Sequence, residues 1–249
     1  MTSEGSGASR AGGEGFHNED AFVVEEGLGL YVVCDGAGGA PAGEIASRLA
    51  ADAMEEFVER ADEELELRGD RIAWTVVHQA MGHAMAAVAD AEKDDPKLRG
   101  LATTVTMLLA QGDRGVIGHR GDSRAYLIRR DRVHQLTVDH ELTEPVSNGA
   151  GADDALDVFA LLLRPGDTIV LCTDGAEEVV QEDAIVRVAR NLSPRLLASR
   201  IVSAAHRRNP GLDATAVVVR VRDEKEPGWL ELSFPTRGTT FGHTLERAA

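Results

Sequence analysis

Several carboxylate residues stand at the ends of predicted strands, and three of them are directly next to a glycine. In chain order they are Glu19, Asp20, Asp35, Asp122, Asp174 and Asp213. Carboxylates brought together repel one another and raise their pKa values unless a cation neutralises them. Hard divalent cations such as Mg²⁺ and Mn²⁺ prefer oxygen ligands. The pattern therefore indicates a site for divalent cations, and two such ions roughly 3.5–4 Å apart activate water and polarise a phosphoryl oxygen.

The glycine-rich stretch after Asp35 raises a competing interpretation, a phosphate-binding nucleotide loop. A Walker loop requires a lysine directly after its second glycine, but Glu44 occupies that position after Gly43. A dinucleotide loop of the form G-x-G-x-x-G begins at Gly36, but Pro41 stands where its third glycine should be. A carboxylate in place of the lysine would repel a phosphate, so both nucleotide interpretations fail.

The acidic composition of the chain argues against nucleic acid as a partner. The chain has 249 residues with 26 Lys and Arg against 42 Asp and Glu, a formal net charge of −16, whereas binding nucleic acid requires a basic surface. Cys34 and Cys172 each lie inside an apolar run, which predicts buried thiols and no disulfide framework. The N-terminus lacks the basic region followed by an apolar region that is typical of a signal peptide, and no apolar run reaches about 18 residues. We therefore expect a cytoplasmic protein without a membrane span.

Hydrophobic periodicity predicts the elements that position these carboxylates. Apolar residues recur every four positions over 42–67 and again along 72–91, which predicts two long amphipathic helices. Apolar runs separated by turns predict strands at 21–25, 29–34, 103–110, 116–119, 124–129, 133–137, 168–173 and 214–221, and helices are also expected at 182–190 and 194–207. This order favours an α+β sandwich over the alternating strands and helices of a nucleotide-binding parallel sheet.

Domain boundaries follow from the ends of this pattern. Residues 1–15 are small and polar and are expected to be a flexible lead-in. The predicted domain covers residues 16–221. Residues 222–249 are rich in Glu, Pro, Gly and Thr, and we interpret them as a C-terminal extension that is either loosely held or a docking segment.

A series of segments resembles the bacterial branch of the metal-dependent protein phosphatases, the PPM or protein phosphatase 2C type. The segments are NEDAF, VVCDGAGG, ATT, GHRGDSRAYLI, LTVDHEL, RPGDTIVLCTDG and DATAVVV. They occur in the family's order over about residues 16 to 221. The resemblance implies a four-layer α/β/β/α sandwich of two antiparallel sheets flanked by helices, with a binuclear Mn²⁺ or Mg²⁺ centre at one end.

Residue roles are carried over from the family motifs one position at a time. Asp35 resembles the carboxylate that bridges both ions, and the Gly36 carbonyl resembles a ligand of one of them. Asp174 and Asp213 match the remaining ligands of the other ion. Asp35 and Asp174 are therefore the expected catalytic residues.

The resemblance also implies an outer set of groups around the two ions. Glu19 and Asp20 match the pair that holds metal-bound water. Asp122, together with Asp174, matches a third and weaker metal site in bacterial members. Ser123 and Arg124 are interpreted as turn and packing residues.

The sequence departs from the family at positions near the expected substrate. The arginine that grips the substrate phosphate is replaced by Gly15, and the nearest arginine is Arg10, which we assign to the phosphate in its place. Ala37 replaces a histidine found in many eukaryotic members, and Ala214 replaces the asparagine that follows the last metal-binding aspartate. The connection between His140 and Pro165 is short, which predicts a reduced flap over the active site.

The resemblance implies a bacterial signalling enzyme that hydrolyses phosphoserine and phosphothreonine in proteins. Its expected partners are a phosphorylated protein and a cognate Ser/Thr kinase, without nucleic acid or membrane, and the expected state is a monomer. A pseudophosphatase that binds a phosphoprotein or kinase is the main alternative, which the replacements at Gly15 and Ala214 favour. A phosphatase of small phosphorylated molecules is a further alternative, because the short flap leaves the cleft open.

Overall fold

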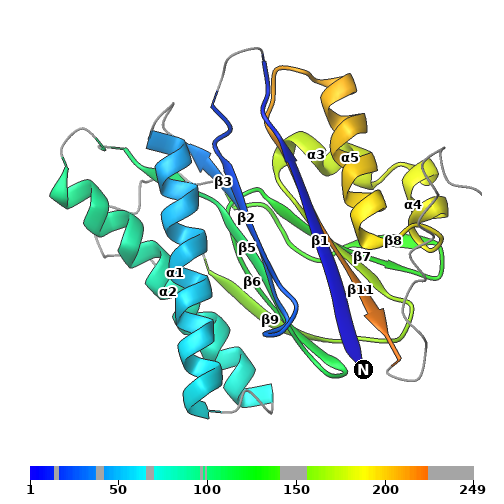
Figure 1. Cartoon of the computed structure of the whole chain (residues 1–249), viewed down its shortest axis with the longest axis horizontal. Coiled ribbons are helices and arrows are strands. Elements are labelled where there is room, and N and C mark those ends of the chain that lie inside the picture. The colour runs from blue at the N-terminus through cyan, green and yellow to red at the C-terminus, as the bar shows by residue number, and fades with distance from the viewer. Residues whose placement is uncertain are drawn as a thin grey trace, which may run out of the picture.

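The protein is described by a computed structural model that covers residues 1–13, 17–37, 42–65, 70–95, 98, 100–140 and 156–223. Its strands form two antiparallel sheets (Figure 1). The first sheet has the order β1 (Thr2–Arg10), β11 (Ala214–Arg222), β10 (Thr168–Cys172), β7 (Arg124–Arg129) and β8 (Arg132–Gln135). The second has the order β2 (Asp20–Glu25), β3 (Leu30–Ala37), β5 (Val105–Gln111), β6 (Arg114–Arg120) and β9 (Asp157–Leu162), and β4 (Ala102–Thr103) pairs with β3.

Helices cover the outer face of each sheet. The long helices α1 (Ala42–Leu65) and α2 (Asp70–Asp94) pack against the second sheet, chiefly through β3 and β6. The helices α3 (Asp174–Val180), α4 (Asp183–Ala189) and α5 (Pro194–Arg208) lie on the first sheet, where α5 packs against β1 and β11 (Figure 1). The four-layer sandwich expected from the sequence is confirmed.

Three apolar cores fill the spaces between these layers. In β3, Leu30, Val32 and Cys34 face α1 and α2, whereas Tyr31 and Val33 face the other sheet. Successive strand residues point to opposite faces, so a central strand of this sandwich is buried on both sides. This explains why the sequence of β3 is a continuous apolar run and does not alternate with polar residues.

The expectation of a flexible lead-in is wrong for residues 2–10, which form β1. This strand pairs with β11 from Thr2 opposite Arg222 to Arg10 opposite Ala214. Its polar composition concealed it, because β1 is an edge strand whose glycines accept aromatic rings from the facing sheet. A Cβ at Gly5 would lie 2.2 Å from Cε1 of Tyr31, and one at Gly7 would lie 2.2 Å from Cε2 of Phe22. The rings supply the apolar contact that the strand itself lacks.

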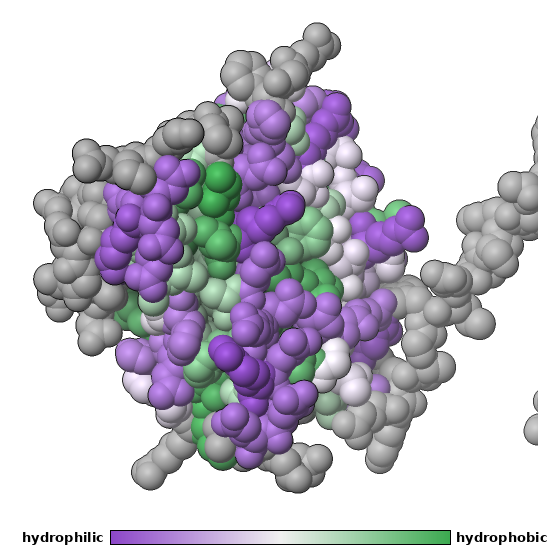
Figure 2. Space-filling model, turned by 60° about the vertical axis from the view of Figure 1, so that its left-hand side comes forward, coloured by the Kyte–Doolittle hydropathy of each residue, from purple (hydrophilic) through white to green (hydrophobic). Residues whose placement is uncertain are grey.

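The outer surface agrees with the acidic composition. Hydrophilic residues cover much of the described surface on the face shown in Figure 2, with hydrophobic patches between them. No described helix is long and apolar enough to cross a membrane. Residues 141–155 of the predicted short connection between His140 and Pro165, and residues 224–249 of the predicted C-terminal extension (222–249), lie outside the described residues. Arg222, the first residue of that extension, ends β11.

Candidate metal centre

The predicted carboxylates come together at one end of the two sheets. Asp20 on β2 lies directly opposite Asp35 on β3 in the strand register. Asp174 begins α3 immediately after β10, Asp213 directly precedes β11, and Asp122 lies in the turn between β6 and β7. The carboxylates that raise the pKa of Asp35 by their charge are Asp20, Asp174, Asp122 and Asp213. Residues far apart in the chain thus share one electrostatic environment.

Burial and mutual repulsion raise the pKa values of this group. Burial is the larger cause for both Asp35 and Asp20, and neighbouring aspartates add to it. The pKa of Asp174 is raised by burial and then by Asp122, and that of Glu19 by burial and then by Asp213. A cluster of this kind holds its protons more tightly than free carboxylates do, unless a cation takes their place.

Asp20 is oriented by threonine and leaves one oxygen without a partner. The Thr173 hydroxyl donates to Asp20 Oδ2 at 2.9 Å and accepts the Thr215 backbone N–H at 3.0 Å. The buried Oδ1 of Asp20 has no hydrogen-bond partner among the residues that the structure describes. An unpaired buried carboxylate oxygen is costly, and a divalent cation or its bound water would satisfy it.

Asp213 joins the first strands of the chain to the last. Gly12 N–H donates to its Oδ1 at 2.6 Å, and Glu19 N–H donates to its Oδ2 at 2.7 Å. Each carboxylate oxygen has a second lone pair that remains available to a ligand. Asp213 therefore places Glu19 and Asp20 beside the other carboxylates, a role that the sequence did not indicate.

Glycines permit a close approach of three backbone segments around Asp35. A Cβ at Gly36 would lie 2.0 Å from the Gly43 carbonyl oxygen, and one at Gly43 would lie 2.0 Å from Oε2 of Glu19. Similarly, a Cβ at Gly175 would lie 2.0 Å from the Asp213 carbonyl oxygen. The glycine-rich stretch thus packs the start of α1 against Glu19 and the backbone that follows Asp35.

A hydroxyl network fixes the backbone of Asp35. Asp35 N–H donates to the Thr104 hydroxyl at 3.0 Å, and the Thr103 hydroxyl donates to the Asp35 carbonyl at 3.0 Å. The Thr104 and Ser123 hydroxyls are 2.7 Å apart and hydrogen-bonded. Ser123 therefore links Asp122 to Asp35, which makes it more than the turn residue expected from the sequence.

A polar pocket of about 520 Å³ opens over these groups. It is lined by Asp35, Ala37, Thr103, Thr104, Asp122, Asp139, His140 and Asp174. Asp139 and His140 belong to the segment LTVDHEL, for which the sequence predicts no catalytic or metal-binding residue. The His140 ring is tilted against the His119 ring at 4.8 Å, and His119 is fully buried between the Thr106 hydroxyl and the Val138 carbonyl. Burial lowers the pKa of His119, and its two hydrogen bonds hold the ring in the core.

Arg10 ends β1 opposite Ala214, so its backbone lies beside the residue that follows Asp213. Gly15 lies outside the described residues. Of the two positions considered for binding the substrate phosphate, Gly15 and Arg10, the structure therefore describes only Arg10.

The donors fit a hard divalent cation. Within the described residues, no three Asp, Glu, His or Cys side chains are arranged as a ready set of ligands. Bare carboxylates repel one another, and Mg²⁺ in particular keeps several waters between itself and its protein ligands. The candidate donor atoms are all oxygens, Oδ1 of Asp20 is unpaired, and the pKa values of Asp35 and Asp20 are raised. These three features together match such an ion.

Comparison with known proteins points to one family. Residues 7–207 match the family model described as "Protein phosphatase 2C". The serine/threonine protein phosphatase PstP of Mycobacterium tuberculosis (strain CDC 1551 / Oshkosh) is 29% identical over 228 residues, covering 83% of this chain and 43% of PstP. The serine/threonine phosphatase stp of Listeria innocua is 29% identical over 212 residues, covering 72% of this chain and 81% of stp. This chain thus spans less than half the length of the mycobacterial relative.

Solved structures give the same answer for the fold. The crystal structure of the catalytic domain of PstP, in complex with two manganese ions, superposes with a TM-score of 0.76 at 26% identity. The superposition covers 89% of this chain and 99% of that domain. The structure of Mycobacterium tuberculosis PstP/Ppp also gives a TM-score of 0.76, at 25% identity over 90% of this chain.

Proposed function

This chain belongs to the protein phosphatase 2C family, and from that premise we propose that it hydrolyses phosphoserine and phosphothreonine in proteins with the help of divalent cations. The observation that carries the proposal is the convergence of Asp20, Asp122, Asp174 and Asp213 on Asp35. Such a cluster is unfavourable without cations. The relative solved with two manganese ions supports the same chemistry.

We assign two Mn²⁺ or Mg²⁺ ions to this cluster, with a third near Asp122 and Asp174. The charges of Asp20, Asp174, Asp122 and Asp213 all act on Asp35, which is therefore the residue that would be shared by both ions. Asp174, Asp213 and the Gly36 carbonyl complete the inner set. When bound, two such ions lower the pKa of water and polarise a phosphoryl oxygen.

The residues of the chain contribute orientation and proton acceptance around the ions. Asp20, held by Thr173 through Oδ2, offers its unpaired Oδ1 as an acceptor for a water hydrogen. Glu19 is fixed through its backbone to Asp213. Arg10, beside Ala214, is assigned to the substrate phosphate, because an arginine presents a charged fork that matches two phosphate oxygens.

The short connection predicted between His140 and Pro165 favours an open cleft, which supports the alternative of a phosphatase of small phosphorylated molecules. A phosphoprotein substrate, a cognate kinase, a monomeric state and a cytoplasmic location all stay predictions. The replacements at Gly15 and Ala214 favour the alternative of a phosphoprotein-binding pseudophosphatase. The retained carboxylates favour the enzyme.

A Mn²⁺-dependent assay with an aryl phosphate and a phosphothreonine peptide tests the proposal. We expect turnover of both substrates, loss of both after chelation, and loss of both in Asp35→Asn. Turnover of the aryl phosphate alone would favour a phosphatase of small molecules. Binding of the phosphopeptide without turnover, in the presence of saturating Mn²⁺, would favour the pseudophosphatase.

A further inference from the structure

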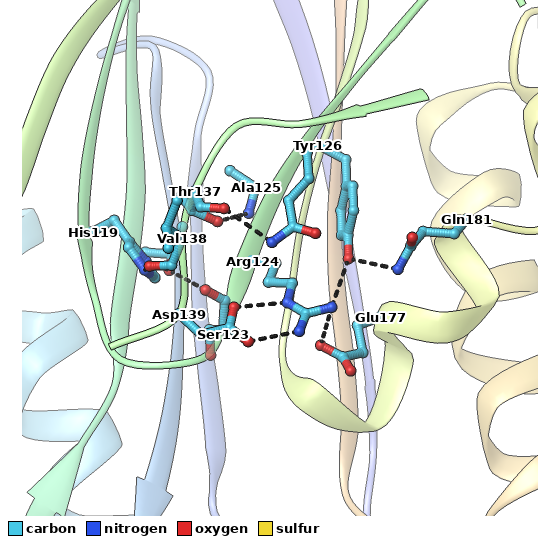
Figure 3. Close-up of polar contacts among 12 residues, drawn as sticks. His119, Ser123, Arg124, Ala125, Tyr126, Thr137, Val138, Asp139, Glu177 and Gln181 are labelled. Atoms are coloured by element: carbon cyan, nitrogen blue, oxygen red, sulfur yellow. Dashed lines mark hydrogen bonds and ion pairs between the residues drawn. The ribbon is translucent and has the colours of Figure 1, made fainter. Parts of the chain in front are cut away.

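Arg124 holds together three segments at the edge of the pocket (Figure 3). Its Nε and Nη2 donate to the two carboxylate oxygens of Asp139, at 2.8 and 2.6 Å. Its Nη1 contacts Oε2 of Glu177 at 2.8 Å and the Tyr126 hydroxyl at 3.4 Å. The Arg124 side chain is 19% exposed, so these interactions are partly shielded from water and are stronger than a typical surface ion pair.

Each of these segments also carries a group that lines the pocket. Arg124 begins β7, two residues after Asp122. Glu177 lies in α3 one turn after Asp174, on the same side of the helix. Asp139 immediately precedes His140, and both line the pocket with Asp122 and Asp174. One guanidinium group thus connects the turn that carries Asp122 to the helix that begins at Asp174.

The charges around Arg124 are almost all negative. The pKa of Glu177 is raised by burial and by Asp139, Asp174 and Asp122, and Arg124 opposes this rise. The pKa of Asp139 is lowered, chiefly by its hydrogen bonds to Arg124. Arg124 therefore holds Asp139 at the pocket wall through both of its carboxylate oxygens and favours its ionised form.

We propose that Arg124 is a positioning residue that sets the separation of Asp122 and Asp174, and thereby the affinity of the cation that these two residues share. The proposal rests on the proposed function, since it assumes that this end of the pocket takes a divalent cation. It gives the motif Gly121-Asp122-Ser123-Arg124 a physical role. Ser123 ties the turn to Asp35, and Arg124 ties it to α3.

Charge and geometry make opposite predictions for Arg124→Met. If only charge matters, removal of a cation from an acidic pocket should strengthen Mn²⁺ binding. If Arg124 positions the ligands, its removal frees α3 and the Asp122 turn and should weaken Mn²⁺ binding. Loss of an outer residue that orients metal ligands typically costs about ten- to hundredfold in affinity. Arg124→Lys keeps the charge but loses the planar fork that holds both oxygens of Asp139.

Arg129, at the far end of β7, provides a matched control. It makes a similar two-pronged pair with Asp167, from Nε at 2.7 Å and Nη2 at 2.5 Å, and its side chain is 24% exposed. It lies on the same strand but away from the pocket. Arg129→Met should therefore lower the melting temperature without changing Mn²⁺ affinity.

The experiment measures Mn²⁺ binding to the metal-free protein by calorimetry, alongside the half-saturating Mn²⁺ concentration for aryl phosphate hydrolysis. We expect Arg124→Met to weaken the weakest-bound ion by about ten- to hundredfold, Arg124→Lys to share most of that loss, and Arg129→Met to bind as the wild type does. Melting temperatures establish that each variant is folded, and Arg124→Lys decides the question if Arg124→Met is not.

Unchanged or tighter Mn²⁺ binding in Arg124→Met and Arg124→Lys would overturn the proposal, as would an equal loss in Arg129→Met. If the wild type binds Mn²⁺ but hydrolyses neither substrate, the proposed function fails, and the binding comparison still decides the role of Arg124. If the wild type binds no Mn²⁺, both proposals fail.

Discussion

At the scale of single residues, the Thr173 hydroxyl holds Asp20, and two backbone N–H groups hold Asp213. Asp35 and Asp174 stood out because each follows an apolar strand and precedes a glycine. Thr173 did not, since a threonine at a strand end has many roles and its bond to Asp20 joins residues 153 positions apart. The backbone donors to Asp213 were equally invisible, because an N–H group belongs to every residue except proline.

Asp213→Asn should destabilise the protein as well as weaken Mn²⁺ binding. Both carboxylate oxygens of Asp213 accept backbone N–H groups, and an asparagine would turn its NH₂ toward one of these donors. Hydrogen bonds to a charged acceptor contribute roughly 1.5–3 kcal/mol, so we expect a loss of that order from one of the two bonds. Chemical denaturation of the metal-free variant measures it, and stability equal to that of the wild type would show that Asp213 is not an anchor.

Thr173→Val should cost about 1–3 kcal/mol of stability, since it leaves a buried acceptor and the Thr215 N–H unpaired. It should also weaken Mn²⁺ binding, because Asp20 loses its fixed orientation. Thr168→Val is the control. Thr168 is fully buried at the start of β10, the strand that ends just before Thr173, and its hydroxyl has no partner among the described residues. Equal losses of stability in the two variants would contradict the role given to Thr173.

At the scale of elements, the long helices and the central strands were predictable because periodicity marks them clearly. The strands β1 and β9 and the helix α3 were not predicted. β1 has few apolar residues, since its glycines lie under the rings of Tyr31 and Phe22. β9 also lies at a sheet edge and was not predicted, although five consecutive apolar residues, Val158 to Leu162, make up most of it. α3 was hidden because it is short and begins at the aspartate that ends the strand motif.

Gly5→Ala tests whether the Tyr31 ring holds β1 in the sheet. The new Cβ would lie 2.2 Å from a ring that is fully buried and has no space to move. Overpacking of this kind costs about 1–3 kcal/mol. Gly27→Ala, in the turn between β2 and β3, meets nothing within 4 Å and should not destabilise the protein. Thermal melts compare the two variants, and a stable Gly5→Ala would show that β1 adjusts freely.

At the scale of the whole molecule, two sheets bring residues from both ends of the chain to one edge, and the fold stores electrostatic repulsion there. The sequence predicted the sandwich and the side chains that repel. It did not predict that β1 lies beside β11 or that Asp213 joins the first strands of the chain to the last, because both features depend on pairing between the ends of the chain.

This repulsion predicts how the stability of the metal-free protein depends on pH. The pKa values of Asp20, Asp35, Asp174 and Glu19 are raised in the folded state. The folded protein therefore binds more protons than the unfolded chain, and its stability should fall as pH rises above the ordinary aspartate pKa of about 3.9. We expect lower stability at pH 8 than at pH 5 by denaturant unfolding. Mn²⁺ should reverse the trend, because it binds the deprotonated carboxylates.

Asp35→Asn should affect the metal-free and the metal-bound protein differently. In the metal-free protein it should reduce the pH dependence of stability. Its removal of charge relieves the repulsion from Asp20 and Asp174, so the metal-free variant should be at least as stable as the wild type at pH 8. A variant that is less stable there would show that Asp35 supports the fold by contacts other than those described.

The most direct test of the central claim is a calorimetric Mn²⁺ titration of the metal-free wild type and of Asp35→Asn at the same pH. The assignment of Asp35 to both inner ions predicts two tightly bound ions per chain in the wild type, in line with the two manganese ions of the PstP catalytic domain. It predicts that at least one of them is lost from Asp35→Asn. Equal stoichiometry and affinity in the two proteins, or no tight ion in the wild type, would contradict the account.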